Sequence, residues 1–152
     1  MADESLLHLN RLHADSQSKY VYFLLAAAGA SLGYGLQKLD GVALTWWVSP
    51  GLFALALWLL SLFSGCEHVT SVQSTMYSNY LLLQLQGGSH PAQPRGAQET
   101  QIALDITRQA IKDKNGTART YFTLQFWLLS FGVLFFTAWR VLEMVRLTFY
   151  AP

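Results

Sequence analysis

Residues 120–139 read TYFTLQFWLLSFGVLFFTAW, twenty consecutive residues without a charged side chain. Two more uncharged stretches precede it, 18 residues at 20–37 and 26 residues at 41–66. A helix crosses the ~30 Å hydrocarbon core of a bilayer with about 20 apolar residues, at about 1.5 Å of rise per residue. Core helices of a soluble protein normally carry a charged outer face, and these three stretches carry none. The sequence therefore predicts an all-α integral membrane protein with three transmembrane helices.

Composition excludes several other classes of protein. The chain has 152 residues, of which 52% are apolar, 14% aromatic and 12% charged. A soluble domain averages about 25% charged residues, and a disordered chain is polar and poor in aromatics. The net charge of +1 provides no basic face for nucleic acid, and the single cysteine, Cys66, forms no disulfide within the chain. An ordinary soluble enzyme, a disordered chain and a nucleic-acid-binding protein are all disfavoured.

Residues that start helices, form loops or end helices divide the chain further. Ser49-Pro50 is typical of a helix start, with an N-cap and a proline at the first helical position. The stretch GGSHPAQPRGA, from Gly87, contains two prolines and three glycines and indicates a loop. Asn115-Gly116 indicates a helix stop or kink. The predicted segments are an amphipathic cytoplasmic helix at 1–19, transmembrane helices at 20–37, 49–65 and 118–141, an external loop at 38–48, a cytoplasmic helical hairpin at 66–117 with a mobile tip at 87–97, and an external tail at 142–152.

Basic residues orient these segments, because cytoplasmic loops are enriched in Lys and Arg. With three spans, the N-terminus and the hairpin share a side that carries seven basic residues, against three on the other side. The seven are Arg11, Lys19, Arg95, Arg108, Lys112, Lys114 and Arg119, and the three are Lys38, Arg140 and Arg146. We expect a cytoplasmic N-terminus and an external C-terminus, in a bacterial inner membrane.

The cytoplasmic extensions are predicted to be amphipathic. Leu6, Leu9 and Leu12 recur every three residues before the first span. After the second span an apolar stripe lies opposite a face of Ser, Gln and Thr; its members are Val69, Val72, Met76, Tyr80 and Leu83. An isolated amphipathic helix of this length is marginal in water, so we expect these stripes to pack together as a small helical bundle.

Four small residues mark a packing face in the first span: Ala26, Gly29, Ala30 and Gly33. In lipid, small residues let two helix backbones approach closely. One interpretation is self-association into a homo-oligomer. The other is packing against the second or third span of the same chain.

Polar and aromatic side chains complete the candidate site. Gln125, Ser130 and Thr137 could line a wet pathway or bond neighbouring helices, although Gln125 could equally lie wetted among headgroups. Gly132 and Trp139 follow Gln125 at heptad spacing on one face. Aromatic side chains gather at the ends of spans and are predicted to anchor them at the interface; they are Trp46, Trp47, Tyr121 and Trp139.

No catalytic, cofactor-binding or metal-binding site is expected. The three uncharged stretches contain no Asp, Glu, Lys, Arg or His, which argues against proton relays and ion-coupled carriers. His8 and His13 are five residues apart, off the i, i+4 spacing of helical metal pairs. The chain contains no Walker loop, GxSxG or CxxC motif.

Three functions fit this sequence. The first is a non-enzymatic, self-associating membrane protein that forms a pore or disrupts the membrane, gated by a cytoplasmic protein or small ligand. The second is an anchor or scaffold that recruits a cytoplasmic partner through the polar face of residues 66–86. The third is a small channel or transport component.

In outline, spans with helical cytoplasmic extensions, the chain is similar to the small multi-span modules of bacterial nucleotide-signalled defence systems. Some of those modules permeabilise the membrane, which the resemblance implies as one function here. It carries over no residue.

Overall fold

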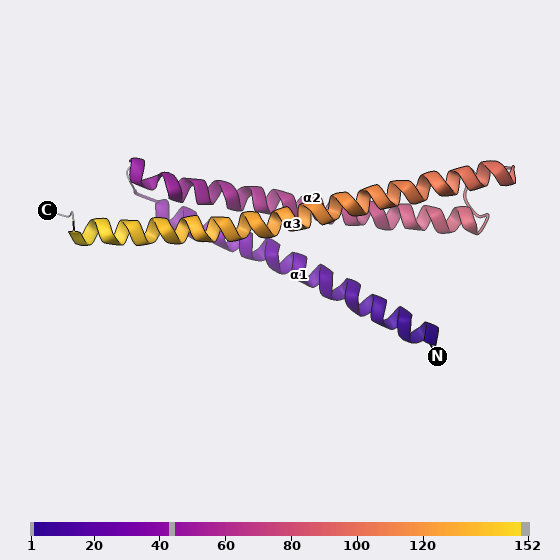
Figure 1. The fold of residues 1–152 in the computed structure, drawn as a ribbon, viewed down its shortest axis with the longest axis horizontal. Helices are drawn as coiled ribbons and strands as arrows, with labels where there is room; N and C mark the ends of the chain where they lie inside the picture. The colour runs from indigo at the N-terminus through magenta and orange to yellow at the C-terminus, as the bar shows by residue number, and fades with distance from the viewer. Residues whose placement is uncertain (1, 43–44, 150–152) are drawn as a thin grey trace. The chain divides into compact units, whose positions relative to one another are not determined.

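The computed structural model describes residues 2–42 and 45–149, with only the backbone for residues 2–7, 9–11, 13 and 14. Over these residues the chain is all-helical, as the sequence predicts. Its elements are α1 (Ala2–Leu39), the short 3-10 helix η1 (Trp46–Val48), α2 (Ser49–Gln86) and α3 (Ala97–Phe149), traced in Figure 1. The predicted stripe residues Leu6 and Leu9 have side chains outside the described part, and the last three residues of the predicted tail lie outside it as well.

The predicted N-cap at Ser49 does not form, although α2 begins at that serine. Ser49 has helical φ and ψ of −55° and −38°, and its hydroxyl donates backward to the Trp46 carbonyl over 2.8 Å instead of accepting from an amide of the first turn. At the other end of α2, Gly88 has φ +69°, and the amide of Ser89 donates to the carbonyl of Gln84 over 3.0 Å. A glycine at positive φ with such a bond is a common way to close a helix, because other residues strain there. The connection to α3 consists of residues 87–96.

The predicted helix stop at Asn115-Gly116 is wrong. Both residues lie inside α3, a continuous helix of 53 residues. A glycine in a helix interior costs only about 1 kcal/mol relative to alanine. That cost is easily outweighed by favourable residues on either side, so an Asn-Gly pair without a following proline need not end a helix.

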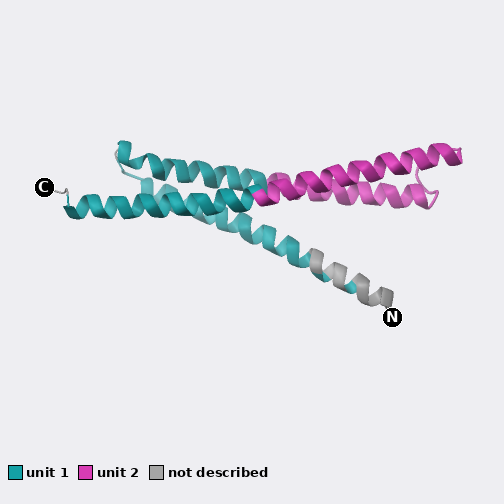
Figure 2. Cartoon of the chain, in the orientation of Figure 1, with its two compact units in different colours: residues 1–65, 124–152 teal, residues 66–123 magenta. Residues whose placement is uncertain are grey.

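The chain divides into two compact units, coloured separately in Figure 2. Unit 1 comprises Met1–Gly65 and Leu124–Pro152, and unit 2 comprises Cys66–Thr123. Unit 1 packs three helical segments around a core of Ala54, Trp58, Phe136 and Trp139. Unit 2 is a hairpin of α2 and α3 without α1, so the predicted cytoplasmic helical bundle is not confirmed.

Two helical stretches are long and apolar enough to cross a membrane, Trp46–Gln86 and Ala97–Phe149. Only 39% and 17% of their most apolar windows are buried by the rest of the chain. A core helix of a soluble protein would be mostly buried, and these windows are not, so the two helices remain candidates for crossing a membrane. Among the described residues α1 does not reach the same mean hydropathy, since residues 20–37 include three Tyr, three Gly, one Ser and one Gln.

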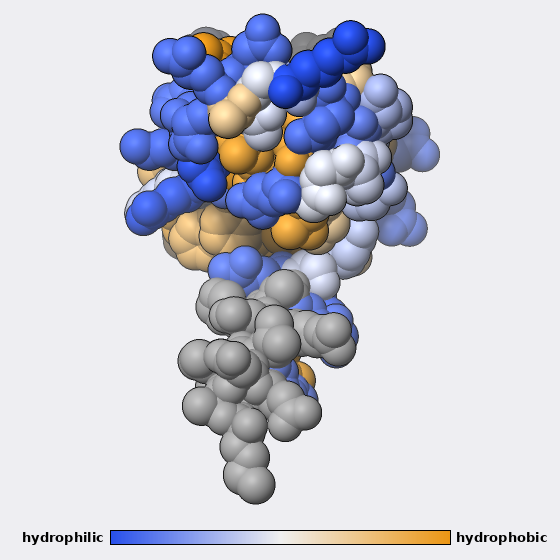
Figure 3. Space-filling view, turned by 90° about the vertical axis from the view of Figure 1, so that its right-hand side faces the viewer, coloured by the Kyte–Doolittle hydropathy of each residue, from blue (hydrophilic) through white to orange (hydrophobic). Residues whose placement is uncertain are grey.

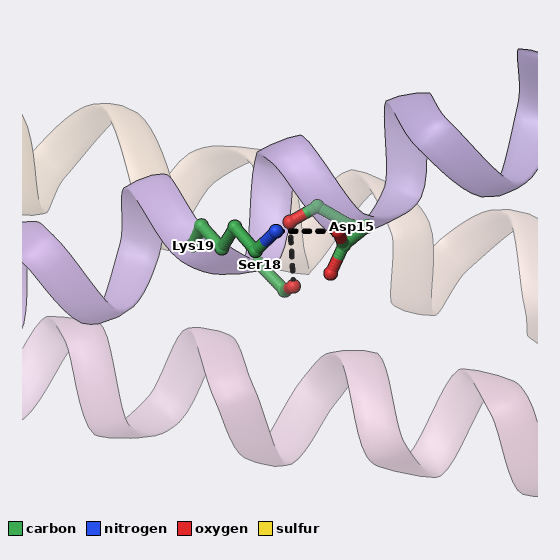
Figure 4. Close-up of polar contacts among 3 residues, drawn as sticks. All are labelled: Asp15, Ser18 and Lys19. Atoms are coloured by element: carbon green, nitrogen blue, oxygen red, sulfur yellow. Dashed lines mark hydrogen bonds and ion pairs between the residues drawn. The ribbon is translucent and has the colours of Figure 1, made fainter.

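The charged part of α1 ends just before that stretch. The Lys19 ammonium lies 2.7 Å from a carboxylate oxygen of Asp15, and the Ser18 hydroxyl donates to the Asp15 carbonyl over 2.9 Å (Figure 4). All three side chains are exposed, so this pair contributes little to stability. It marks the polar boundary of an apolar segment.

Candidate functional site

In unit 1, α2 and α3 pair large side chains with glycines. A Cβ placed on Gly51 would lie 2.9 Å from the Trp139 ring, and one placed on Gly132 would clash with Nε1 and Cδ1 of Trp58. Both tryptophans are buried, and the Trp58 indole donates to the backbone carbonyl of Leu129 over 3.3 Å. Each glycine therefore makes the space that the opposite indole fills.

The third pair of this seam joins Gly65 and Gln125. A Cβ on Gly65 would lie 2.5 Å from Gln125 Nε2 and equally close to a methyl group of Leu25 on α1. The Ser61 hydroxyl donates to the backbone carbonyl of Gln125 over 2.8 Å. The amide side chain thus lies between three helical segments of unit 1, at the place where only a glycine leaves room.

These contacts form a heptad seam. The α2 members are seven residues apart, and so are the α3 members. They pair in antiparallel order as Gly51 with Trp139, Trp58 with Gly132, and Gly65 with Gln125. The sequence indicated the α3 half through the spacing of Gln125, Gly132 and Trp139, whereas the α2 half was missed although its Gly, Trp and Gly also recur every seven residues.

Gln125 is 0% exposed, and neither its amide nitrogen nor its amide oxygen has a hydrogen-bond partner among the described residues. Each unpaired buried polar group costs about 1–3 kcal/mol. The side chain therefore does not lie wetted among headgroups, as one interpretation had it. The unpaired buried amide lowers stability, so stability alone does not explain why a glutamine occupies this position.

The suggested pathway along Gln125, Ser130 and Thr137 does not form on one face. Gln125 points into the seam, Thr137 is exposed, and the half-buried Ser130 donates its hydroxyl to the Phe126 carbonyl over 2.9 Å. On a helix of 3.6 residues per turn, positions five and twelve residues after Gln125 lie about 140° and about 120° away from it around the axis. The hydroxyls of Ser130 and Thr137 therefore share one face of α3, and the amide of Gln125 lies on another face.

The small-residue face of α1 points outward. Ala26, Gly29, Ala30 and Gly33 are all exposed, and nothing lies within 4 Å of a Cβ built on either glycine. Packing within the chain uses Gly35 instead, where a Cβ would lie 2.6 Å from a Leu55 methyl and 2.9 Å from the Trp58 ring. Gly33 and Gly35 are two positions apart, which places them about 200° apart around the helix.

The expected interface aromatics divide into two groups. Trp46 is 83% exposed and Trp47 50% exposed, beside the start of α2. Tyr121 is half-buried. Trp139 is only 1% exposed, because its indole fills the space above Gly51 rather than facing the surroundings. The structure thus corrects the role expected of Trp139 from an anchor to a core residue.

The predicted apolar stripe of α2 lies only partly on the inward face of unit 2. Thr75 and Ser78 of α2 are buried, and His68 Nδ1 donates to the Ala118 carbonyl over 2.7 Å. Of the stripe, Met76, Tyr80 and Leu83 are exposed, whereas Val69 and Val72 are half-buried. Seen from the end that carries the α2–α3 connection, the surface is mostly hydrophilic with hydrophobic atoms between the polar ones (Figure 3).

Among the described residues no group of three or more His, Cys, Asp and Glu side chains could hold a metal ion. Cys66 is an exposed free thiol. No family model matches the chain, and no curated protein or solved structure is detectably similar to it. Function therefore has to follow from the chain's own features, which are the small-residue face of α1, the exposed apolar side chains of α2 and the polar contacts within each unit.

Proposed function

We propose that this chain is a non-enzymatic, multi-pass integral membrane protein that self-associates through the small-residue face of α1. The observation that carries the proposal is the open space around Gly29 and Gly33. In lipid there is no hydrophobic force to bring helices together, so close van der Waals contact between small residues is a main source of association. A face of Ala and Gly that meets no partner within the described part of its own chain provides such contact for a second copy.

The topology we propose has three spans, with residues 20–37 as the first, the N-terminus in the cytoplasm and the C-terminus outside a bacterial inner membrane. The low burial of the apolar windows in α2 and α3 supports two of these spans. The 18 uncharged residues of α1 and the bias of basic residues support the third and the orientation.

The assembly would permeabilise the membrane by a passage between chains. Trp58 and Trp139 fill the seam of a single chain, so among the described residues the outward faces are the candidates for lining a passage. Ser130 and Thr137 share such a face and provide hydroxyls for water or ions.

The test of self-association uses Gly33→Ile, with Leu36→Ile as the matched control. Leu36 is exposed on the same helix and keeps its volume in the change. Crosslinking in native membranes and mass measurement in detergent should give oligomers for the wild type and the control, and monomers for Gly33→Ile. Monomeric wild-type protein in both experiments contradicts the proposal.

Liposomes test the passage itself. Purified protein in sealed vesicles should release a trapped dye or dissipate an ion gradient, and Gly33→Ile should reduce this release together with the oligomer. An oligomer without any flux eliminates permeabilisation but leaves self-association in place.

A membrane anchor or scaffold is the second candidate, and a specific surface favours it. Met76, Tyr77, Tyr80 and Leu83 present a strip of apolar and aromatic side chains on α2, and residues 69–86 contain no charged side chain. Aromatic residues and methionine are enriched at protein interfaces. Absence of flux, combined with loss of a cellular crosslinked complex in Leu83→Glu but not in Gly33→Ile, would move this candidate to first place.

A further inference from the structure

The inward face of the unit 2 hairpin contains a lysine held only by hydroxyl groups. Lys114 of α3 directs its ammonium to two serines of α2, at 2.6 Å from Ser74 Oγ and 3.2 Å from Ser78 Oγ. Lys114 and Ser74 are half-buried, and Ser78 is buried. The cationic group is therefore drawn into the hairpin instead of extending into the surroundings.

No carboxylate neutralises this ammonium within the described part of the chain. The ion pairs found there involve Lys19, Arg108 and Arg146, and Lys114 takes part in none of them. Asp113, its neighbour in sequence, is exposed and accepts a hydrogen bond from Gln109 over 3.0 Å. A partly desolvated charge without a counter-ion is unfavourable, so the group favours an anion that can reach it.

The donors available at this place fit an oxyanion. The Ser78 hydroxyl hydrogen is used, since Ser78 Oγ donates to the Ser74 carbonyl over 3.0 Å. Among the described residues the Ser74 hydroxyl accepts from Lys114 and donates to no group. An ammonium has three hydrogens, and two of them point to the serines. One ammonium hydrogen and the Ser74 hydroxyl hydrogen thus remain for a ligand.

We propose that Lys114 and Ser74, supported by Ser78, form a binding site for a phosphate group. Lysine binds phosphates as a point charge, and hydrogen bonds in which one partner is ionised are about twice as strong as neutral ones. The phosphate is either a free or small-molecule phosphate or a phosphomonoester lipid headgroup, because both present the same oxygens. The site lies within unit 2 and depends neither on self-association of α1 nor on a passage.

Calorimetric titration of the full chain in detergent with inorganic phosphate, at constant ionic strength, tests the site. The wild type should bind, and Lys114→Met should weaken binding by about ten-fold or more, because a charge-assisted hydrogen bond is lost. Lys112→Met is the matched control, since Lys112 is an exposed lysine on the same helix. Equal binding by Lys114→Met and the wild type, equal losses in both lysine variants, or a wild type that does not bind would each overturn the proposal.

A second pair of variants guards against misfolding of Lys114→Met. Ser74→Ala removes one hydroxyl and should weaken phosphate binding by about three-fold or more, whereas Ser89→Ala removes an exposed hydroxyl of the α2–α3 connection and should leave it unchanged. Unchanged binding in Ser74→Ala, with helicity preserved by circular dichroism, rules out the arrangement.

Nanodiscs identify the source of the phosphate. If the ligand is a headgroup, phosphatidate added to a phosphatidylcholine disc should compete with inorganic phosphate in the wild type. If the ligand is a free phosphate, the affinity should be the same in discs with and without phosphatidate. In both cases the dependence on Lys114 must persist.

Discussion

Replacing Gly132 with leucine should break the seam of unit 1. A Cβ at this position would already clash with Nε1 and Cδ1 of Trp58, and it would lie 3.1 Å from Cε2. Leucine adds three more carbons to that Cβ. The indole of Trp58 is buried and cannot swing outward without opening the core around Phe136 and Trp139.

The magnitude follows from three contributions. Overpacking of a filled core costs about 1–3 kcal/mol. Displacing the indole also loses the hydrogen bond from Trp58 to the Leu129 carbonyl, which contributes about 1 kcal/mol. The better helix propensity of leucine returns about 0.8 kcal/mol relative to glycine. The free energy of unfolding should fall by about 1–3 kcal/mol.

Denaturant titration in detergent, followed by helicity and tryptophan fluorescence, measures this change. Gly116→Leu is the control, because Gly116 lies on the same helix with nothing within 4 Å of its Cβ position. It should be neutral or stabilising by up to about 1 kcal/mol. Trp58→Ala should cost about 3–5 kcal/mol, and in that background Gly132→Leu should cease to destabilise because leucine fills the vacated space. Equal stability of Gly132→Leu and Gly116→Leu, or strict additivity in the double variant, would refute the packing of the seam.

The same experiments extend to other positions. Gln125→Leu should leave the free energy of unfolding unchanged or raise it, because two unpaired buried polar atoms are removed at nearly constant volume, while Gln125→Ala should lower it relative to leucine. Gly35→Leu should destabilise unit 1 by about 1–3 kcal/mol, whereas Gly29→Leu, with open space around it, should change the oligomeric state and not the stability of the monomer. In discs of brominated lipid, Trp127→Phe, which removes an exposed tryptophan, should lower the quenched share of the fluorescence, because the buried Trp58 and Trp139 resist quenching.

Periodicity along one segment predicted the helices well, but it predicted poorly which faces of different helices pack against each other. The helical class follows from composition, and the Ser49-Pro50 pair predicts where α2 begins, although Ser49 does not act as its N-cap. The heptad spacing of Gln125, Gly132 and Trp139 indicated one face of α3. The side of α2 that packs against that face is set by how an indole fits over a glycine. The sequence of a single helix does not reveal the spaces on its partner helix.

The glycines of α1 illustrate the same limit. The spacing of Gly29 and Gly33 fits a GxxxG packing motif. Within the chain, however, another helix packs against Gly35. Small residues permit close packing wherever a neighbouring helix lies. The sequence of one helix does not determine where that neighbour lies. In unit 2 the predicted apolar stripe turns inward only in part, since Lys114 and Ser74 meet across the hairpin while Leu83 is 66% exposed.

The large-and-small alternation of the seam also explains why one register is favoured. Shifting α3 by one heptad in one direction would place Trp58 opposite Trp139 and Gly65 opposite Gly132. A shift in the other direction would oppose Gly51 to Gly132 and Trp58 to Gln125. Either shift creates an overpacked pair of large side chains and an empty pair of glycines, each of which costs energy. The unpaired amide of Gln125 also favours this register, because Gly65 is the position on α2 that leaves room for its side chain. A buried polar group that lowers stability while fixing register is a known use of such groups, and here it gives a physical reason for a glutamine in an otherwise apolar seam.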